Sequence, residues 1–176
     1  MNTANKLTMI RVALIPIFMS VLYIGFPYSN YVAMAIFVIA SITDFADGYI
    51  ARSRGQVTDF GKFTDPLADK ILVVSAMLWF VETAVMPGWV ALIVIIREFM
   101  VTALRLVAVG EGRVIDAATS GKIKTVVTMI CLTIMHFELP RWMLNTCLAA
   151  ISVTTLVSGI DYYVKNIDVL KMDGIV

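Results

Sequence analysis

The chain contains little charge and few of the residues that usually hold transition metals. Of its 176 residues, 15% are charged, and there are two cysteines and one histidine. This scarcity excludes a disulfide-built domain and a metal centre made of cysteine and histidine. Cys131 and Cys147 lie in apolar surroundings without metal-ligand spacing, so we expect both to be packing residues. His136 stands near the end of an apolar run beside Phe137 and Glu138, where an interfacial role is expected rather than a catalytic one.

Hydrophobic residues make up 60% of the chain. They form continuous runs of the length that crosses a bilayer as a helix, and these runs do not alternate as a barrel strand would. Turn-forming residues follow the first, third and fifth runs at Gly25-Phe26-Pro27, Pro87-Gly88 and Leu139-Pro140. The pattern predicts an all-α integral membrane protein, a single domain over residues 1–176, with six spans at 8–26, 30–52, 60–83, 88–109, 121–138 and 141–164. No cleavable signal peptide is expected, and the first span is expected to direct its own insertion.

The basic residues predict the orientation of these spans. They gather before the first span, around the second and fourth connections, and after the last span, whereas Arg141 alone falls at a connection on the other side. Cytoplasmic loops of membrane proteins carry the excess of Lys and Arg. Both termini and connections two and four are therefore expected in the cytoplasm.

Four aspartates stand where the second and third spans meet, in the stretch DFADGYIARSRGQVTDFGKFTDPLADK, residues 44–70. Asp44 and Asp47 are three residues apart, and Gly61, Asp65 and Asp69 recur every four, so each set shares one face of a helix. Gly48 and Ala51 continue the first face as a smooth floor that a ligand can approach closely.

Four neighbouring carboxylates repel one another unless a cation lies between them. Oxygen-only ligands suit a hard divalent ion, so the cluster predicts one or two Mg²⁺ or Mn²⁺ ions. The alternatives are a proton or cation relay in a carrier, or carboxylate–arginine pairs that serve packing alone. The position of the cluster at helix ends and the lack of a matching half-repeat argue against a carrier.

The spacing Asp44-x2-Asp47-Gly48-x2-Ala51-Arg52-x8-Gly61-x3-Asp65-x3-Asp69 resembles the signature of the CDP-alcohol phosphotransferase family at every fixed position. Members are six-helix membrane enzymes, often homodimers, which transfer a phosphoryl-linked alcohol from a CDP-activated donor to a hydroxyl and release CMP. Further pieces resemble the bacterial branch that makes phosphatidylglycerophosphate: NKLTMIR (5–11), TDFADGYIAR (43–52), FGKFTDPLADK (60–70), REFMVTALR (97–105) and GKIKT (121–125).

This resemblance implies that CDP-diacylglycerol and sn-glycerol 3-phosphate react to give phosphatidylglycerophosphate and CMP at the cytoplasmic face of a bacterial inner membrane, with no nucleic-acid partner. Asp44, Asp47 and Asp65 would hold the metal, and Asp69 would be a further ligand or the catalytic base. Arg52 would contact the diphosphate, with Gly48, Ala51 and Gly61 leaving room for the donor. The alternatives are a sister transferase that uses inositol phosphate, serine or a phospholipid as acceptor, and a cation carrier.

Independent of the resemblance, a dianionic acceptor phosphate requires fixed cations. Arg105 and Lys122, with Lys62, are the expected clamp, and Arg97 and Lys124 are further candidates. Arg97 and Arg105 lie inside an apolar run, where topology alone does not account for them. The alternatives are a structural pairing of Arg97 with Glu98 and an ordinary cytoplasmic-side position for Lys124.

Asn5, Thr8 and Arg11 recur every three residues at the start of the first span. The family resemblance places this segment beside the cytidine, where an amide and a hydroxyl suit the base or ribose. For Asn5 the alternative is a helix N-cap.

Overall fold

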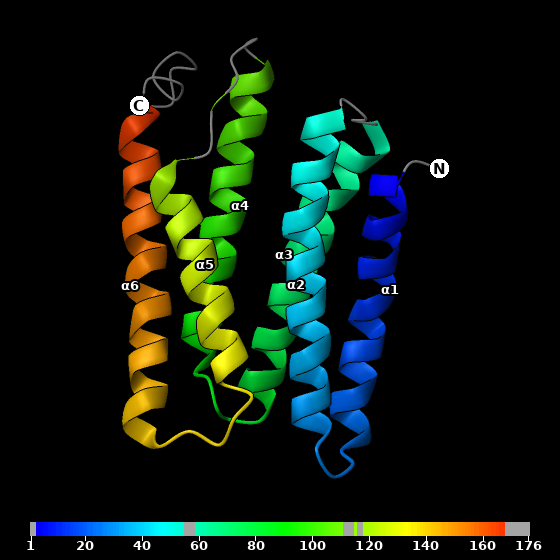
Figure 1. Cartoon of the computed structure of the whole chain (residues 1–176). Coiled ribbons are helices and arrows are strands. Elements are labelled where there is room, and N and C mark those ends of the chain that lie inside the picture. Colours follow the sequence, from blue (N-terminus) through cyan, green and yellow to red (C-terminus); the bar gives the residue numbers. More distant parts are fainter. Residues whose placement is uncertain (1–2, 55–58, 111–114, 116–117, 168–176) are drawn as a thin grey trace. The chain divides into compact units, whose positions relative to one another are not determined.

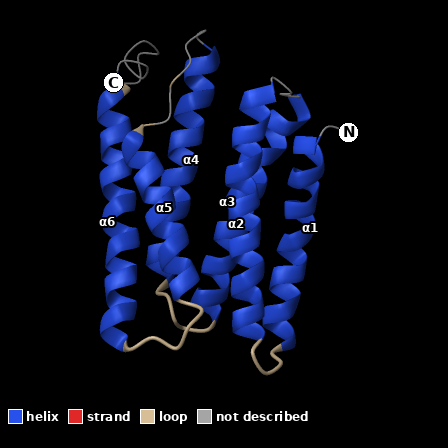
Figure 2. Ribbon diagram, in the orientation of Figure 1, coloured by secondary structure: helices blue, strands red, loops and turns tan. Residues whose placement is uncertain are grey.

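The computed structural model describes the backbone of residues 3–54, 59–110, 115 and 118–167, and the side chains of residues 9–43, 67–68, 70–110, 115 and 118–167. Within these ranges the chain forms six helices and no strand (Figure 2). They are α1 (Thr3–Ile24), α2 (Ser29–Arg54), α3 (Asp59–Glu82), α4 (Gly88–Gly110), α5 (Thr119–Ile134) and α6 (Arg141–Lys165) (Figure 1). The all-α prediction is confirmed, and the helix positions agree with the predicted spans to within a few residues.

The helix ends follow the predicted turn chemistry, with one exception. Gly25 has a φ of +66° immediately after α1, a left-handed conformation that glycine adopts without a steric penalty. Pro140 precedes α6 with an extended backbone. The exception is α5, which ends at Ile134 although the predicted span continues to residue 138. The residues after Ile134 form a turn, and Met135 and His136 are buried there.

The helices form two compact units. The first contains α1, α2 and α3 together with residues 132–138, and α1 packs against both α2 and α3. Its core surrounds His136, which is 4% exposed and contacts the rings of Phe18, Phe37 and Phe80. The His136 Nδ1–H donates to the Leu132 carbonyl at 2.8 Å. An interfacial role was expected for His136, and its burial among three phenylalanine rings was not predicted.

The second unit contains α4, most of α5 and α6. Helices α4 and α6 pack together, and part of their core is formed by Leu104, Ala108 and Tyr162. The start of α5 is tied to the end of α6, because the Ser120 hydroxyl donates to Asp161 at 2.5 Å and Lys165 pairs with the same carboxylate at 2.8 Å.

The distribution of side chains is that of a protein surrounded by lipid. Large apolar residues such as Ile24, Phe99 and Leu106 are about 70% exposed, whereas Arg11 is fully buried and Lys124 is 3% exposed. Exposed apolar surface on this scale is stable only against another apolar phase. Tyr23 and Trp79, in edge-to-face contact at one end of the first unit, are typical of a membrane–water interface.

Among the described residues, α6 is long and apolar enough to cross a membrane, while residues 9–24 and 29–43 form shorter apolar stretches. Helix α4 is equally apolar in most of its length but carries Arg97, Glu98 and Arg105 near its middle. The six-span arrangement remains a prediction.

Candidate active site

The aspartate segment lies on two helical ends joined by a short connection. Asp44 and Asp47 occupy the last three turns of α2, and Gly61, Asp65 and Asp69 occupy the first three turns of α3. Residues 55–58 connect the two helices. The helical backbone confirms the periodicity from which the two carboxylate faces were predicted.

The side chains of most residues predicted from the signature lie outside the described residues. This holds for Asn5, Thr8, Asp44, Asp47, Gly48, Ala51, Arg52, Gly61, Lys62, Asp65 and Asp69. The fit to a metal therefore rests on the chemistry of the donor set. Carboxylates at i, i+3 and i, i+4 on helical backbone form an all-oxygen set, which suits a hard divalent cation.

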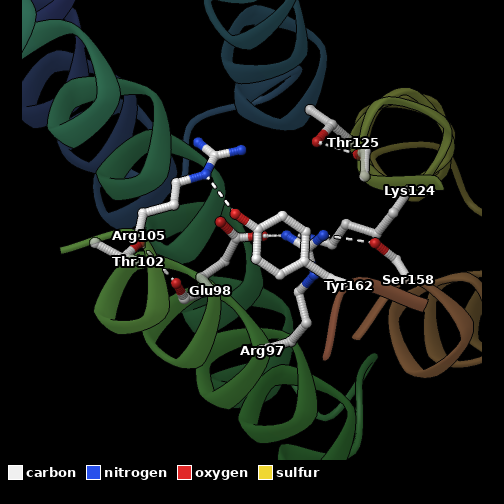
Figure 3. A network of polar contacts seen from close by, with 9 residues as sticks. Arg97, Glu98, Thr102, Arg105, Lys124, Thr125, Ser158 and Tyr162 are labelled. Atoms are coloured by element: carbon white, nitrogen blue, oxygen red, sulfur yellow. Dashed lines mark hydrogen bonds and ion pairs between the residues drawn. The ribbon is translucent and has the colours of Figure 1, made fainter. Parts of the chain in front are cut away.

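A described polar cluster links α4, α5 and α6 in the second unit (Figure 3). Glu98 is its centre: one carboxylate oxygen lies 3.1 Å from the Arg97 Nη1 and 2.8 Å from the Lys124 Nζ. The Arg97 Nη2 also donates to the Ser158 hydroxyl at 2.5 Å. These side chains are 11% (Arg97), 22% (Glu98) and 4% (Lys124) exposed. Among the described side chains, this weakly solvated cluster joins two cations to one anion.

Two glycines make room for the Arg97 guanidinium. A Cβ added at Gly121 of α5 would lie 3.1 Å from the Arg97 Nη2, and one added at Gly159 of α6 would lie 3.4 Å from its Cγ. The first spacing is tighter than ordinary van der Waals contact. Glycine at position 121, the first residue of the GKIKT piece, therefore lets α5 approach Arg97 closely.

Arg105 is held differently. Its Nε–H donates to the Tyr162 hydroxyl at 2.9 Å, and its guanidinium carbon lies 5.6 Å from the centre of the Tyr162 ring. Tyr162 is 2% exposed, whereas Arg105 is an exposed residue. Arg97 and Arg105, predicted together as phosphate ligands, thus both contact α6, one turn apart at Ser158 and Tyr162.

The two lysines of α5 are not brought together. Residues two apart on a helix point about 200° from each other. Lys124 is consequently buried against Glu98 while Lys122 is exposed. Lys124 therefore differs from an ordinary exposed lysine of a cytoplasmic loop. Arg97 has the pairing with Glu98 that was given as its alternative role.

Arg11 is the member of the predicted nucleotide-binding group whose side chain is described. It is fully buried in the first unit. Arg11 lies in the same unit as α2 and α3, and its contact with the cytidine stays a prediction.

Sequence reasoning missed the residues of α6. Ser158, Gly159 and Tyr162 contact the two arginines, and none was predicted. A signal was present, since Thr155, Ser158 and Tyr162 are spaced by three and four residues on an otherwise apolar helix. All three are buried. Such spacing indicates a polar stripe that faces inward.

Comparisons with known proteins agree with the signature. A sequence model described as CDP-alcohol phosphatidyltransferase matches residues 1–158. The chain is 41% identical to a CDP-diacylglycerol–glycerol-3-phosphate 3-phosphatidyltransferase of Bacillus subtilis, over 97% of each chain. It is 37% identical to a probable phosphatidylglycerophosphate synthase of Mycobacterium tuberculosis, over 93% of this chain and 81% of the relative. A 3-phosphatidyltransferase of Salmonella typhimurium with the same name as the Bacillus protein is 38% identical over 80% of each chain.

Proposed function

The chain belongs to the CDP-alcohol phosphatidyltransferase family, and from this premise we propose that it transfers the phosphatidyl group of CDP-diacylglycerol to sn-glycerol 3-phosphate. The products are phosphatidylglycerophosphate and CMP. The observation that carries the proposal is the similarity over nearly the whole chain to relatives named for this transfer. The basic residues of the second unit support it, because a phosphorylated acceptor needs more positive charge than a neutral alcohol.

Enzymes of this family generally use divalent metal ions. In this chain Asp44, Asp47 and Asp65, with Asp69, would hold one or two ions, Mg²⁺ or Mn²⁺. When bound, the metal supplies positive charge beside the diphosphate of the donor and the departing CMP.

The chain's own residues supply the remaining chemistry. Asp69 accepts the proton of the acceptor 1-hydroxyl, and the resulting oxygen nucleophile attacks the phosphorus that bears diacylglycerol, in line with the CMP oxygen. Arg52 contacts the donor diphosphate. The small residues Gly48, Ala51 and Gly61 leave space for the donor, and Asn5, Thr8 and Arg11 lie beside the cytidine.

Arg105 and Lys122, with Lys62, bind the acceptor phosphate in this proposal. Arg97 and Lys124 support this binding indirectly in the proposal, because both contact Glu98. Both are neutralised in part by Glu98, and their surplus charge raises the positive potential of the second unit.

The membrane arrangement follows from the two substrates. The acyl chains of the donor stay in the bilayer while its headgroup reaches the surface, and glycerol 3-phosphate arrives from water. We propose a homodimer in the bacterial inner membrane, with both termini and the aspartate segment on the cytoplasmic side, since the basic residues concentrate there.

The test is CMP release by the purified protein in detergent with CDP-diacylglycerol and Mg²⁺. Glycerol 3-phosphate, inositol 1-phosphate, inositol and serine are offered one at a time, and a chelator is added in a parallel reaction. Release with glycerol 3-phosphate alone, abolished by the chelator and restored by Mg²⁺ or Mn²⁺, is the expected result. Release with another acceptor would overturn the acceptor assignment, and no release with any acceptor from folded protein would overturn the transferase assignment.

A further inference from the structure

Tyr162 is a buried tyrosine whose hydroxyl is hydrogen-bonded to an arginine of another helix. It lies on α6, is 2% exposed, and accepts a hydrogen bond from the Arg105 Nε of α4 at 2.9 Å. Its ring also lies near the guanidinium, at 5.6 Å from ring centre to guanidinium carbon. Two contacts of different kinds thus fix the same cationic group.

The contact at Nε leaves a particular part of Arg105 available. A guanidinium is a planar fork with five N–H donors, and the edge formed by its two terminal nitrogens matches two oxygens of a phosphate. Figure 3 shows these terminal nitrogens on the side of the guanidinium away from the Tyr162 hydroxyl. Among the described side chains, Tyr162 is the hydrogen-bond partner of Arg105, and Arg105 itself is exposed.

Arg97, one of the other predicted phosphate ligands, offers a contrast. Its Nη1 is bound to Glu98 and its Nη2 to Ser158, so its terminal edge is already occupied inside the unit. The two arginines therefore have different tasks. Arg97 holds helices together, whereas Arg105 presents its terminal edge outward.

We infer that Tyr162 is a positioning residue for the acceptor phosphate: it holds Arg105 by Nε so that the terminal edge of the guanidinium is pre-oriented for an anionic phosphate. This inference rests on the proposed function. A long, rotatable arginine side chain loses conformational freedom when it binds a ligand, and a buried partner removes part of that loss in advance. The effect belongs to acceptor binding and leaves the chemistry at the aspartates unchanged.

The decisive variant is Tyr162→Phe, which keeps the ring and removes the hydroxyl. A hydrogen bond to a charged group is strong enough that its loss changes an equilibrium by about tenfold. We expect the KM for glycerol 3-phosphate to rise by about this factor, with kcat and the KM for CDP-diacylglycerol within about twofold of wild type. Tyr163→Phe is the matched control, since Tyr163 is the next residue of α6, is 40% exposed, and its hydroxyl makes no hydrogen bond with described residues.

A double-mutant cycle separates positioning from other roles. If Tyr162 acts through Arg105, Tyr162→Phe has no further effect in an Arg105→Ala background. Arg105→Lys, which keeps the charge but lacks the fork, should raise the same KM. An unchanged glycerol 3-phosphate KM in Tyr162→Phe, or an equal loss for both substrates, would overturn the inference. So would an undiminished effect in the Arg105→Ala background, because Tyr162 would then bind the phosphate itself. Failure of the proposed function is seen separately, as wild-type protein that releases no CMP with glycerol 3-phosphate.

Discussion

The charged side chains around Glu98 lie in a site with little access to water. Among the described residues, Glu98 pairs with two cations, Lys124, whose side chain is 4% exposed, and Arg97, whose side chain is 11% exposed. An ion that is shielded from water depends on its counter-ion, because water no longer offers an alternative. Glu98 is therefore the counter-ion of both weakly solvated cations in Figure 3.

We expect Glu98→Gln to destabilise the protein, because it leaves Lys124 and Arg97 without a counter-charge. Breaking a buried pair costs several kcal/mol, and the partial exposure of Glu98 reduces this to about 2 kcal/mol, or roughly 5 °C in Tm. Thermal unfolding in detergent measures the loss. Glu82→Gln is the control, since Glu82 is exposed and bonded to Tyr23. Adding Lys124→Met to Glu98→Gln should recover part of the stability, and an unchanged Tm in Glu98→Gln would contradict the role assigned to Glu98.

Asp69 is expected to act in the reaction itself. Asp69→Asn removes the proposed base while keeping the size of the side chain, and general bases contribute about 10²–10⁴-fold to rate. Turnover should fall by at least about 10²-fold, while binding of CDP-diacylglycerol, measured as a rise in Tm with added donor, should remain detectable. Activity near that of wild type would show that another group accepts the proton.

Whole helices were predictable where long apolar runs met turn residues. The end of α5 was not, because the turn that follows Ile134 buries His136 among Phe18, Phe37 and Phe80. Tertiary packing decided that boundary, and a periodic pattern contains no information about it. Similarly, Lys122 and Lys124 were both candidates for the acceptor phosphate, and only the structure shows that Lys124 is buried.

The family could be predicted from the aspartate motif, because its i+3 and i+4 spacing lies in consecutive sequence and the comparisons show the same family, whereas the roles of the single aspartates stay predictions. The contacts of α6 with Arg97 and Arg105 could not be predicted, although the spacing of Ser158 and Tyr162 indicates a polar stripe that faces inward. Ser158 is 61 residues from Arg97, and Tyr162 is 57 from Arg105. Contacts over such separations depend on how helices pack, which one sequence does not show.

The pairing of α5 with α6 has a direct chemical test. Ser120 near the start of α5 bonds Asp161 near the end of α6, so we expect Cys131 near the end of α5 to lie beside Cys147 near the start of α6. Both cysteines are free and buried. We expect a trivalent arsenical, which bridges two neighbouring thiols, to bind once per chain and to protect both from later alkylation after unfolding. Cys147→Ala should abolish this protection of Cys131, and independent alkylation of the two thiols in folded, arsenical-treated protein would contradict the pairing.

At the scale of the molecule, apolar side chains form the core and also cover much of the surface, and several polar side chains are buried. Charged and hydroxyl side chains such as Arg11, Lys124 and Ser158 are buried, while isoleucine, leucine and phenylalanine side chains cover the exterior. A lipid surrounding makes both features compatible, since apolar surface costs nothing there and buried polar groups find partners on neighbouring helices. This places the donor lipid in the same phase as the protein, so that only the water-soluble acceptor must be captured from solution.

The orientation in that membrane decides from which side the acceptor enters, and it can be measured with single cysteines. In a Cys131→Ala, Cys147→Ala background, Glu138→Cys lies at the α5–α6 connection and Lys165→Cys at the end of α6, and both positions are exposed. The concentration of basic residues on one side predicts that a membrane-impermeant maleimide labels the first in intact cells and the second only after permeabilisation. The reverse pattern would place the aspartate segment outside the cell. Glycerol 3-phosphate made in the cytoplasm would then have no access to it, and the proposed reaction would be excluded in that orientation.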